Sequence, residues 1–331
     1  MPSLTSEPIP VTLGTWPTPL EAAPRLARAL GLGPPDLWIK RDDLTGLGGG
    51  GNKVRKLEWI CGDAVARGAD TLVTCGARQS NHARLTAAAG ARLGLDVVLV
   101  LAGPGDGPES GNVALDGLLG ASVVWAGDVP HEELGAIASA VIAQRRHKGA
   151  HPALIPYGGS NALGARGYAE CGRELLTQAP DLTTVVTAVG SGGTMAGLVH
   201  ALGARHVLGV DCGALEQPAA AVAGLVAELS GASPVPADLR MRLDQVGAGY
   251  SELTEPVMAA LTLAARTEGL ILDPIYTGRA MAGLVASVAD GHITPGQRTV
   301  FLHSGGLPGL FGHPTTVSRA AEGVVIFPME H

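Results

Sequence analysis

Residues 71–103 read TLVTCGARQSNHARLTAAAGARLGLDVVLVLAG, and this stretch indicates the fold class. Its ends are short runs rich in β-branched residues, TLVTC (71–75) and VVLVLA (97–102), and between them an alanine-rich segment over 82–93 has the length of a helix. A strand, a helix and a second strand in this order predict two parallel strands joined by a crossover helix.

The same alternation continues along the chain. Further strands are expected over 122–125, 183–189, 206–211 and 299–303, and further helices over 110–118, 132–146, 161–176, 194–203, 217–230, 252–268 and 278–289. The segment GPGDGPESGN (103–112) has the glycine, proline and aspartate content of a surface loop. The pattern therefore predicts an α/β protein with open, parallel-type twisted sheets that carry helices on both faces.

Composition excludes several classes of protein. A hydrophobic fraction of 46% against a charged fraction of 16% excludes a disordered chain, and 331 residues suggest about two domains. With 30 acidic against 23 basic residues the net charge is −7, so we expect no nucleic-acid partner. The N-terminal MPSLTSEPIP has no basic and apolar leader, and the run 97–102 is too short to span a bilayer, which favours a cytoplasmic protein without a membrane partner. Cys61, Cys75, Cys171 and Cys212 form no CxxC pair, so buried free thiols are expected and no metal site.

The first segment with potential chemistry is GLGGGGNKVRKLE (46–58). It is not a Walker A motif, because Lys53 is followed by Val54 instead of Ser or Thr. The glycines allow the backbone to approach a ligand closely, and Lys53 is expected just inside the following helix. A lysine in such a place is commonly a solvated surface residue; the functional alternative is a Schiff-base lysine in a closely packed apolar setting.

The second segment is GARQSNHAR (76–84), which follows the strand 71–75 and begins the next helix. Ser80 can cap that helix, and the cap alone would explain the serine. Alternatively, Ser80, Asn81 and the exposed amides bind a carboxylate at the helix N-terminus. A substrate with a carboxylate would then face this end of the strand.

The third segment is GSGGTMAG (190–197), directly after the strand 183–189. Met195 stands where the dinucleotide fingerprint GxGxxG needs its third glycine, which disfavours a dinucleotide. A strand, a glycine-rich turn, hydroxyls and a helix start can still hold a phosphate monoester. The donors would come from Ser191, Gly192, Gly193 and Thr194.

The last two segments are DPIYTGRAMAGL (273–284) and FLHSGGLPGLFG (301–312). Aromatic residues are only 3% of the chain, so Tyr276 before a helix and Tyr250 in the sequence GAGY stand out, although either could simply pack at a helix start. Ser304 lies at a strand end beside two glycines, as expected where a hydroxyl approaches a planar ring.

Together the five segments resemble the pyridoxal-phosphate (PLP) enzymes of fold type II, the tryptophan synthase β-like fold, in the group of D-cysteine desulfhydrase and 1-aminocyclopropane-1-carboxylate deaminase. The likeness runs from LEAAPRLARALG (20–31) and LWIKRDDLTGL (37–47) to HSGGLPGLFG (303–312). The resemblance implies PLP as cofactor, a small amino acid as substrate and a homodimer. It also implies a large cofactor-binding domain of residues 1–54 and 164–331 and a small domain of residues 55–163.

The resemblance further implies the roles of single residues. Lys53 would be the Schiff-base lysine and, once displaced by the substrate, the base. Asn81 would contact the ring oxygen of the cofactor, and residues 191–194 would hold its phosphate. Ser80, Asn81 and His82 would engage the substrate carboxylate. Lys53, Ser80, Tyr250 and Tyr276 are thus the expected catalytic residues.

Thr277 and Ser304 bear on the choice of reaction, because the cyclopropane-opening deaminases of the group carry Glu and Leu at these places. A carboxylate would stabilise a protonated ring nitrogen, whereas two hydroxyls would leave it neutral or weakly polarised. The sequence therefore favours α,β-elimination of D-cysteine to pyruvate, ammonia and hydrogen sulfide. Two arginines depart from the pattern of the group. At the position of Arg78 the group commonly has a small or apolar residue, and at the position of Arg279 it commonly has a lysine.

Other functions stay open from the sequence alone. Within the group these are 1-aminocyclopropane-1-carboxylate deamination and a sulfo-lyase reaction on cysteate. If cysteate is the substrate, Arg78 could bind its sulfonate; otherwise Arg78 forms a surface ion pair. From other classes they are a non-catalytic protein with the PLP fold and a nucleotide-binding protein. The intact Lys53, Ser80 and tyrosines argue against the non-catalytic alternative.

Overall fold

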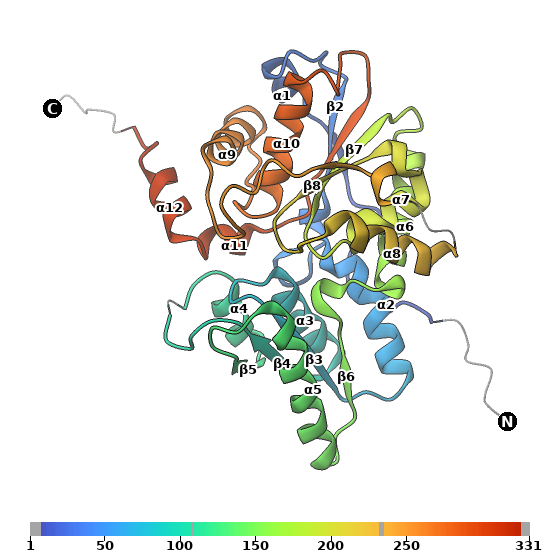
Figure 1. The fold of residues 1–331 in the computed structure, drawn as a ribbon, viewed down its shortest axis with the longest axis vertical. Coiled ribbons are helices and arrows are strands. Elements are labelled where there is room, and N and C mark those ends of the chain that lie inside the picture. The colour runs from blue at the N-terminus through green and yellow to red at the C-terminus, as the bar shows by residue number, and fades with distance from the viewer. Residues whose placement is uncertain (1–7, 108, 232–234, 326–331) are drawn as a thin grey trace.

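The computed structural model describes residues 8–107, 109–231 and 235–325, and it contains two sheets that lie one above the other in Figure 1. A six-stranded sheet has the order β1-β2-β10-β7-β8-β9, and a four-stranded sheet has the order β5-β4-β3-β6. Neighbouring strands are parallel except β1 and β2. The strands are β1 (Leu20–Ala22), β2 (Leu37–Lys40), β3 (Thr71–Gly76), β4 (Asp96–Leu101), β5 (Ser122–Trp125), β6 (Pro152–Leu154), β7 (Thr184–Val189), β8 (Val207–Asp211), β9 (Arg240–Arg242) and β10 (Thr299–Leu302).

Helices cover both faces of the six-stranded sheet. Along β7, Val186 and Ala188 pack with α1, α9 and α10, whereas Val185 and Val189 on the opposite face pack with α6, α7 and α8. This alternation follows from the two-residue period of a strand, and burial of both faces explains the continuous apolar run. The helices of this part are α1 (Pro24–Ala29), α6 (Ala162–Gln178), α7 (Gly193–Leu202), α8 (Pro218–Ser230), α9 (Glu255–Glu268), α10 (Thr277–Ala289), α11 (Leu307–Phe311) and α12 (Pro314–Ala321).

The four-stranded sheet is built in the same way. Leu72 and Leu99 pack against α2 and α3, and Val73 and Val98, which are partners in the β3–β4 register, pack against α5 on the other face. The helices of this part are α2 (Lys53–Ala66), α3 (Asn81–Leu93), α4 (Asn112–Leu118) and α5 (His131–His147). The predicted fold class, an α/β protein with two mostly parallel sheets and helices on both faces, is confirmed.

The strands and helices that the sequence predicted are present, with ends that differ by up to three residues. The short elements α1, α11, α12, β1, β2, β6 and β9 were not predicted. Residues 104–106 are exposed, as expected for a surface loop, and the four cysteines are buried and free. None of the helices in the described ranges is long and apolar enough to cross a membrane.

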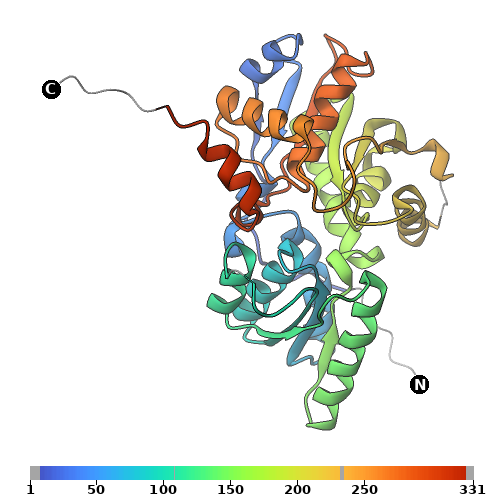
Figure 2. The same cartoon turned by 60° about the vertical axis from the view of Figure 1, so that its left-hand side comes forward.

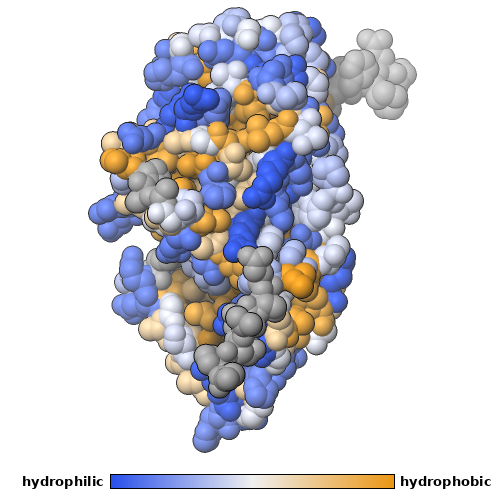
Figure 3. All heavy atoms as spheres, turned by 90° about the vertical axis from the view of Figure 1, so that its right-hand side faces the viewer, coloured by the Kyte–Doolittle hydropathy of each residue, from blue (hydrophilic) through white to orange (hydrophobic). Residues whose placement is uncertain are grey.

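The sheets use different parts of the chain. Strands β3 to β6 come from residues 71–154, and the six-stranded sheet uses residues before and after them. Figure 2 shows the same two parts from a second direction, and Figure 3 shows a notch between them on the face at the right of Figure 1. The division into residues 55–163 and the two flanking segments stays a prediction, which this distribution of strands supports.

A buried ionic network holds α2 at the junction of the two parts. Arg55 donates to both oxygens of Asp42 at 2.8 and 3.0 Å and to Glu174 at 2.8 and 2.9 Å, and the Tyr168 hydroxyl donates to Asp42 at 2.6 Å. Burial opposes ionisation of Asp42, but the charge and hydrogen bonds of Arg55 outweigh it and lower the pKa of this carboxyl. The network fixes the first turn of α2, where Lys53 lies.

Candidate active site

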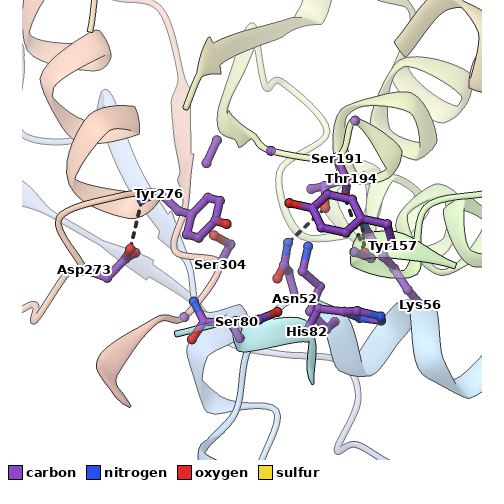
Figure 4. A pocket seen from close by; sticks show the side chains of 17 residues that line it. Asn52, Lys56, Ser80, His82, Tyr157, Ser191, Thr194, Asp273, Tyr276 and Ser304 are labelled. Atoms are coloured by element: carbon purple, nitrogen blue, oxygen red, sulfur yellow. Dashed lines mark hydrogen bonds between the residues drawn. The ribbon is translucent and has the colours of Figure 1, made fainter. Parts of the chain in front are cut away.

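The candidate active site is a cavity of about 620 Å³, including its mouth, between the two parts of the molecule (Figure 4). It lies at the carboxyl ends of β3, β7 and β10, where open α/β sheets bind ligands. The cavity is lined by Asn52, Lys53, Lys56, Ser80, Asn81, His82, Tyr157, Gly158, Ala188, Gly190, Ser191, Gly192, Thr194, Asp273, Tyr276, Ser304 and Gly305.

Lys53 is the first residue of α2 and follows a glycine turn. Gly48, Gly49, Gly50 and Gly51 all have positive φ, and a Cβ on Gly50 would lie 1.9 Å from the Asp43 carbonyl oxygen, so the turn requires glycine there. The buried Arg84 donates to the carbonyls of Gly48 and Gly50 and holds the turn in place.

Two lysines one helical turn apart face this cavity. Burial lowers the pKa of Lys53 to about 8, which leaves part of its amino groups neutral near neutral pH. Burial and the neighbouring Lys53 hold the pKa of Lys56 well below its ordinary value. The Lys56 amino group donates to Ser160 Oγ at 3.0 Å and to the Gly158 carbonyl at 3.2 Å.

The turn after β7 collects hydroxyl and amide groups on one wall. Gly192 has φ +86° and precedes the first residue of α7. Ser191 Oγ lies 2.7 Å from Ser160 Oγ, which also accepts a hydrogen bond from the Gly193 amide at 3.1 Å. Thr194 Oγ1 accepts one from Asn52 at 3.0 Å. Neutral donors at a helix N-terminus, with Lys56 beside them, suit a phosphate monoester in both shape and charge.

The opposite wall begins at the end of β3. Ser80 Oγ accepts a hydrogen bond from the Ala83 amide at 3.1 Å, so the predicted cap of α3 is confirmed. His82 Nε2 lies 2.9 Å from Thr74 Oγ1, whose proton goes to the Ile155 carbonyl, so His82 carries its own proton on Nε2. Burial, with Lys53 and Lys56 nearby, lowers the pKa of His82 well below its ordinary value. The imidazole is therefore a neutral group, and any anion at this wall meets the first-turn amides of α3.

Two tyrosines form a pair at the third wall. The Tyr276 and Tyr250 hydroxyl oxygens are 2.6 Å apart, and their rings meet edge to face at 6.2 Å. Burial raises the pKa of both phenols. Asp273 accepts hydrogen bonds from the amides of Ile275, Tyr276 and Thr277 and from the Thr277 hydroxyl, and so caps α10. Figure 4 shows the Tyr276 and Tyr157 rings at the cavity from opposite sides.

The structure brings most of the predicted site residues to the cavity: Lys53, Ser80, Asn81, His82, Ser191, Gly192, Thr194, Tyr276 and Ser304 line it. Three predicted residues are not among the lining residues. Tyr250 lies behind Tyr276, Gly193 contributes its amide to Ser160, and the buried Thr277 uses its hydroxyl on Asp273 at 2.7 Å.

Arg78 is not among the lining residues either. Its guanidinium stacks on the Trp125 ring at 4.6 Å and donates to the Pro104 carbonyl. The side chain thus ties the loop after β3 to the loop after β4. A surface ion pair and a sulfonate site, the alternatives considered from the sequence, both stay predictions.

Sequence reasoning missed eight lining residues. Four of them have polar side chains, namely Asn52, Lys56, Tyr157 and Asp273, and the others are Gly158, Ala188, Gly190 and Gly305. Lys56 had a usable signal, because residues three apart on a helix share a face with each other. Asp273 also had one, since an aspartate before a helix start commonly accepts its free amides. Tyr157 had one as well, because it directly precedes Gly158, Gly159 and Ser160, a glycine-rich turn with a hydroxyl of the kind seen at 190–194.

Comparisons with known proteins agree with this geometry. The family model described as pyridoxal-phosphate dependent enzyme matches residues 11–305. A putative 1-aminocyclopropane-1-carboxylate deaminase of Pyrococcus abyssi is 41% identical over 91% of this chain and 92% of its own. A D-cysteine desulfhydrase of Klebsiella pneumoniae is 41% identical over 90% of this chain and 94% of its own.

Solved structures give the same result. The crystal structure of an ACC deaminase homologue matches with a TM-score of 0.86 and 35% identity, over 94% of this chain and 96% of that one. A tomato threonine deaminase, 20% identical with a TM-score of 0.66, covers 93% of this chain and 88% of that one and shares the fold. With a lysine, a phosphate-suited turn and a carboxylate-suited helix start in one cavity, the chain belongs to the pyridoxal-phosphate dependent enzymes, fold type II, and uses pyridoxal 5'-phosphate as its cofactor.

Proposed function

We propose that this PLP-dependent lyase catalyses α,β-elimination of D-cysteine, with water, to pyruvate, ammonia and hydrogen sulfide. The observation that carries the proposal is the position of Lys53 at the junction of the three walls described above. Bound PLP withdraws electrons from the substrate Cα and so makes the α-proton acidic. The chain supplies binding, orientation and the base.

Lys53 Nζ is the group we assign to the covalent attachment of the cofactor. The neutral Lys53 amine, when not attached to the cofactor, would take the α-proton of the substrate, and the low pKa of Lys53, which is caused by burial, favours this role. Residues 191–194 are assigned to the phosphate, and Lys56, whose amino group lies 3.0 Å from Ser160 Oγ, is assigned to the same anion. An anionic phosphate would raise the depressed pKa of Lys56 and give that lysine a charge-assisted partner.

Ser80, Asn81 and His82 are assigned to the substrate carboxylate, with His82 contributing its main-chain amide. The helix start of α3 provides amides and a favourable dipole for this anion. Tyr276, supported by Tyr250, is assigned to the departing sulfur. Its raised pKa, caused by burial, keeps the phenol protonated, so it can donate a hydrogen bond to a thiolate leaving group.

The preference for elimination over ring opening rests on the acidic groups of the cavity. Asp273 is the one carboxylate that the described part of the chain contributes to the lining, and each of its oxygens already accepts two hydrogen bonds from the start of α10. Ser304 offers a hydroxyl, and Thr277 presents no carboxylate. A protonated ring nitrogen would therefore lack an available anionic partner, which supports D-cysteine over 1-aminocyclopropane-1-carboxylate.

The test is keto-acid release by the purified holoenzyme from D-cysteine, L-cysteine, β-chloro-D-alanine, cysteate and 1-aminocyclopropane-1-carboxylate. We expect the highest kcat/KM for D-cysteine, with one hydrogen sulfide for each pyruvate. A higher kcat/KM for the cyclopropane substrate would overturn the proposal. The double variant Thr277→Glu, Ser304→Leu should lower sulfide release, and unchanged release would show that these residues do not act on the ring.

Two further proposals rest on the family resemblance. We propose that the enzyme acts in the cytoplasm and as a homodimer. Sedimentation of the holoenzyme at micromolar concentration tests the second, and a monomer would contradict it.

A further inference from the structure

Arg279 is a fully buried cation that binds only main-chain carbonyls in the described part of the chain. One terminal nitrogen donates to the Cys212 carbonyl at 2.6 Å, and the other donates to the carbonyls of Gly249 and Glu252, both at 2.9 Å. The guanidinium forms no ion pair within the described ranges, and its Nε has no hydrogen-bond partner there. The carboxylate of the buried Asp211 is near enough to interact with this charge but forms no ion pair with it, so carbonyl binding must compensate for most of the cost of burial.

The carbonyls that Arg279 binds belong to two separate segments. Cys212 directly follows β8, whereas Gly249 and Glu252 lie in the irregular connection between β9 and α9. This connection is exposed at Gly247, Ala248 and residues 251–252. The segment therefore depends on a small number of anchors, and Arg279 holds it on both sides of Tyr250.

Arg279 also connects the two tyrosines of the active site. It lies three residues after Tyr276, on the helix that Tyr276 precedes. Tyr250 lies between Gly249 and Glu252, whose carbonyls share one Arg279 nitrogen. One side chain therefore ties the segment that carries Tyr250 to the helix that follows Tyr276, whose hydroxyl is 2.6 Å from that of Tyr250.

We propose that Arg279 is a positioning residue that fixes the segment 249–252, and through it the Tyr250 hydroxyl, against Tyr276. The planar guanidinium can reach carbonyls of both segments at once, which a single ammonium group cannot do equally well. The inference rests on the proposed function for the role of the tyrosine pair, but the geometry of the segment can be measured without it.

The first test is hydrogen exchange of the holoenzyme. In Arg279→Lys, and in Arg279→Met if it folds, amides of residues 246–252 should exchange about tenfold faster, because hydrogen bonds that close the segment are lost. Amides of β7 should be unchanged. Arg319→Lys is the matched control, because Arg319 also donates two hydrogen bonds, at 2.7 and 2.8 Å, but to the exposed side chain of Glu255. This variant should leave the exchange of residues 246–252 and of β7 unchanged. Parent-like exchange of residues 246–252 in Arg279→Lys would overturn the proposal.

The second test is a double-mutant cycle with Tyr250→Phe, read as kcat/KM for D-cysteine. If Arg279 acts through Tyr250, Arg279→Lys should lower kcat/KM about tenfold in the parent and less than twofold in Tyr250→Phe. Losses that multiply would overturn the positioning role. If D-cysteine proves not to be the substrate, the proposed function fails, while the exchange measurement still decides on Arg279.

Discussion

Replacement of Gly158 by alanine tests whether the wall around Ser191 holds the cofactor phosphate. Gly158 has φ +61°, and a Cβ there would lie 2.1 Å from Ser191 Oγ and 2.6 Å from Ser191 Cβ. Since Cβ contacts under 3.0 Å are essentially never found, Ser191 must retreat by roughly 1 Å. That movement disturbs its 2.7 Å contact with Ser160.

The magnitude follows from two separate effects. Left-handed backbone conformation at a residue with a Cβ costs about 1 kcal/mol of folding free energy. The displacement of Ser191 also weakens hydrogen bonds to the phosphate, and a hydrogen bond to a charged group contributes about 1.5–3 kcal/mol, or about 10-fold to 100-fold in Kd. We therefore expect the Kd for PLP to rise about 10-fold to 100-fold in Gly158→Ala.

Gly149→Ala is the matched control, because Gly149 has φ +86° and nothing within 4 Å of an added Cβ. In denaturant both variants should lose about 1 kcal/mol of unfolding free energy for the left-handed backbone, and Gly158→Ala should lose about 1–3 kcal/mol more for the displacement of Ser191. PLP titration of the apoprotein, followed by absorbance, should separate them, since Gly149→Ala should keep the parent Kd. Equal PLP affinity of the two variants would refute the phosphate assignment.

Three further predictions concern other parts of the molecule. The rate at which the apoprotein takes up PLP should rise with pH and level off above about pH 8, because the neutral Lys53 amine is the reactive form and burial lowers the Lys53 pKa to about 8. A rate that is constant between about pH 6 and 9 would contradict this. Arg78→Ile should lower kcat/KM for D-cysteine and for cysteate by the same factor, because the guanidinium stacks on Trp125. A selective loss of ~10-fold in kcat/KM for cysteate would show that Arg78 contacts the substrate. Asp42→Asn should lower the unfolding free energy by about 3 kcal/mol, because Arg55 would lose its fully buried charged partner. A loss under about 1 kcal/mol in urea titration would show that the network contributes little to stability.

The sequence predicted the long elements because their signals are local. The runs 71–75 and 183–189 are apolar on both faces of a strand, which is typical of parallel sheets covered by helices. By contrast, β6 and β9 have three residues each, too few to show a period, and β9 contains two arginines. These strands exist because a neighbouring strand offers hydrogen bonds, which no local pattern records.

The residues of the candidate site also differ in how far their positions follow from local sequence. Lys53, Ser80 and Ser191 were predicted because each follows a turn or strand end whose chemistry is local. Thr277 was expected at the ring of the cofactor, but its hydroxyl bonds to Asp273, a contact that depends on the turn before α10. Tyr157 and Gly158 line the cavity because the turn that carries them lies where the two sheets meet.

The most direct test of the account is the site at which borohydride fixes PLP to the holoenzyme. The chain has four lysines, and cleavage at arginine places them in separate peptides: Lys40 in residues 29–41, Lys53 in 42–55, Lys56 in 56–67 and Lys148 in 147–166. Mass spectrometry should find the reduced pyridoxyl group on the peptide 42–55 alone, and Lys53→Ala should abolish it. A label on the peptide 56–67 or 147–166, or one that persists in Lys53→Ala, would contradict the assignment of Lys53 on which the proposed function rests.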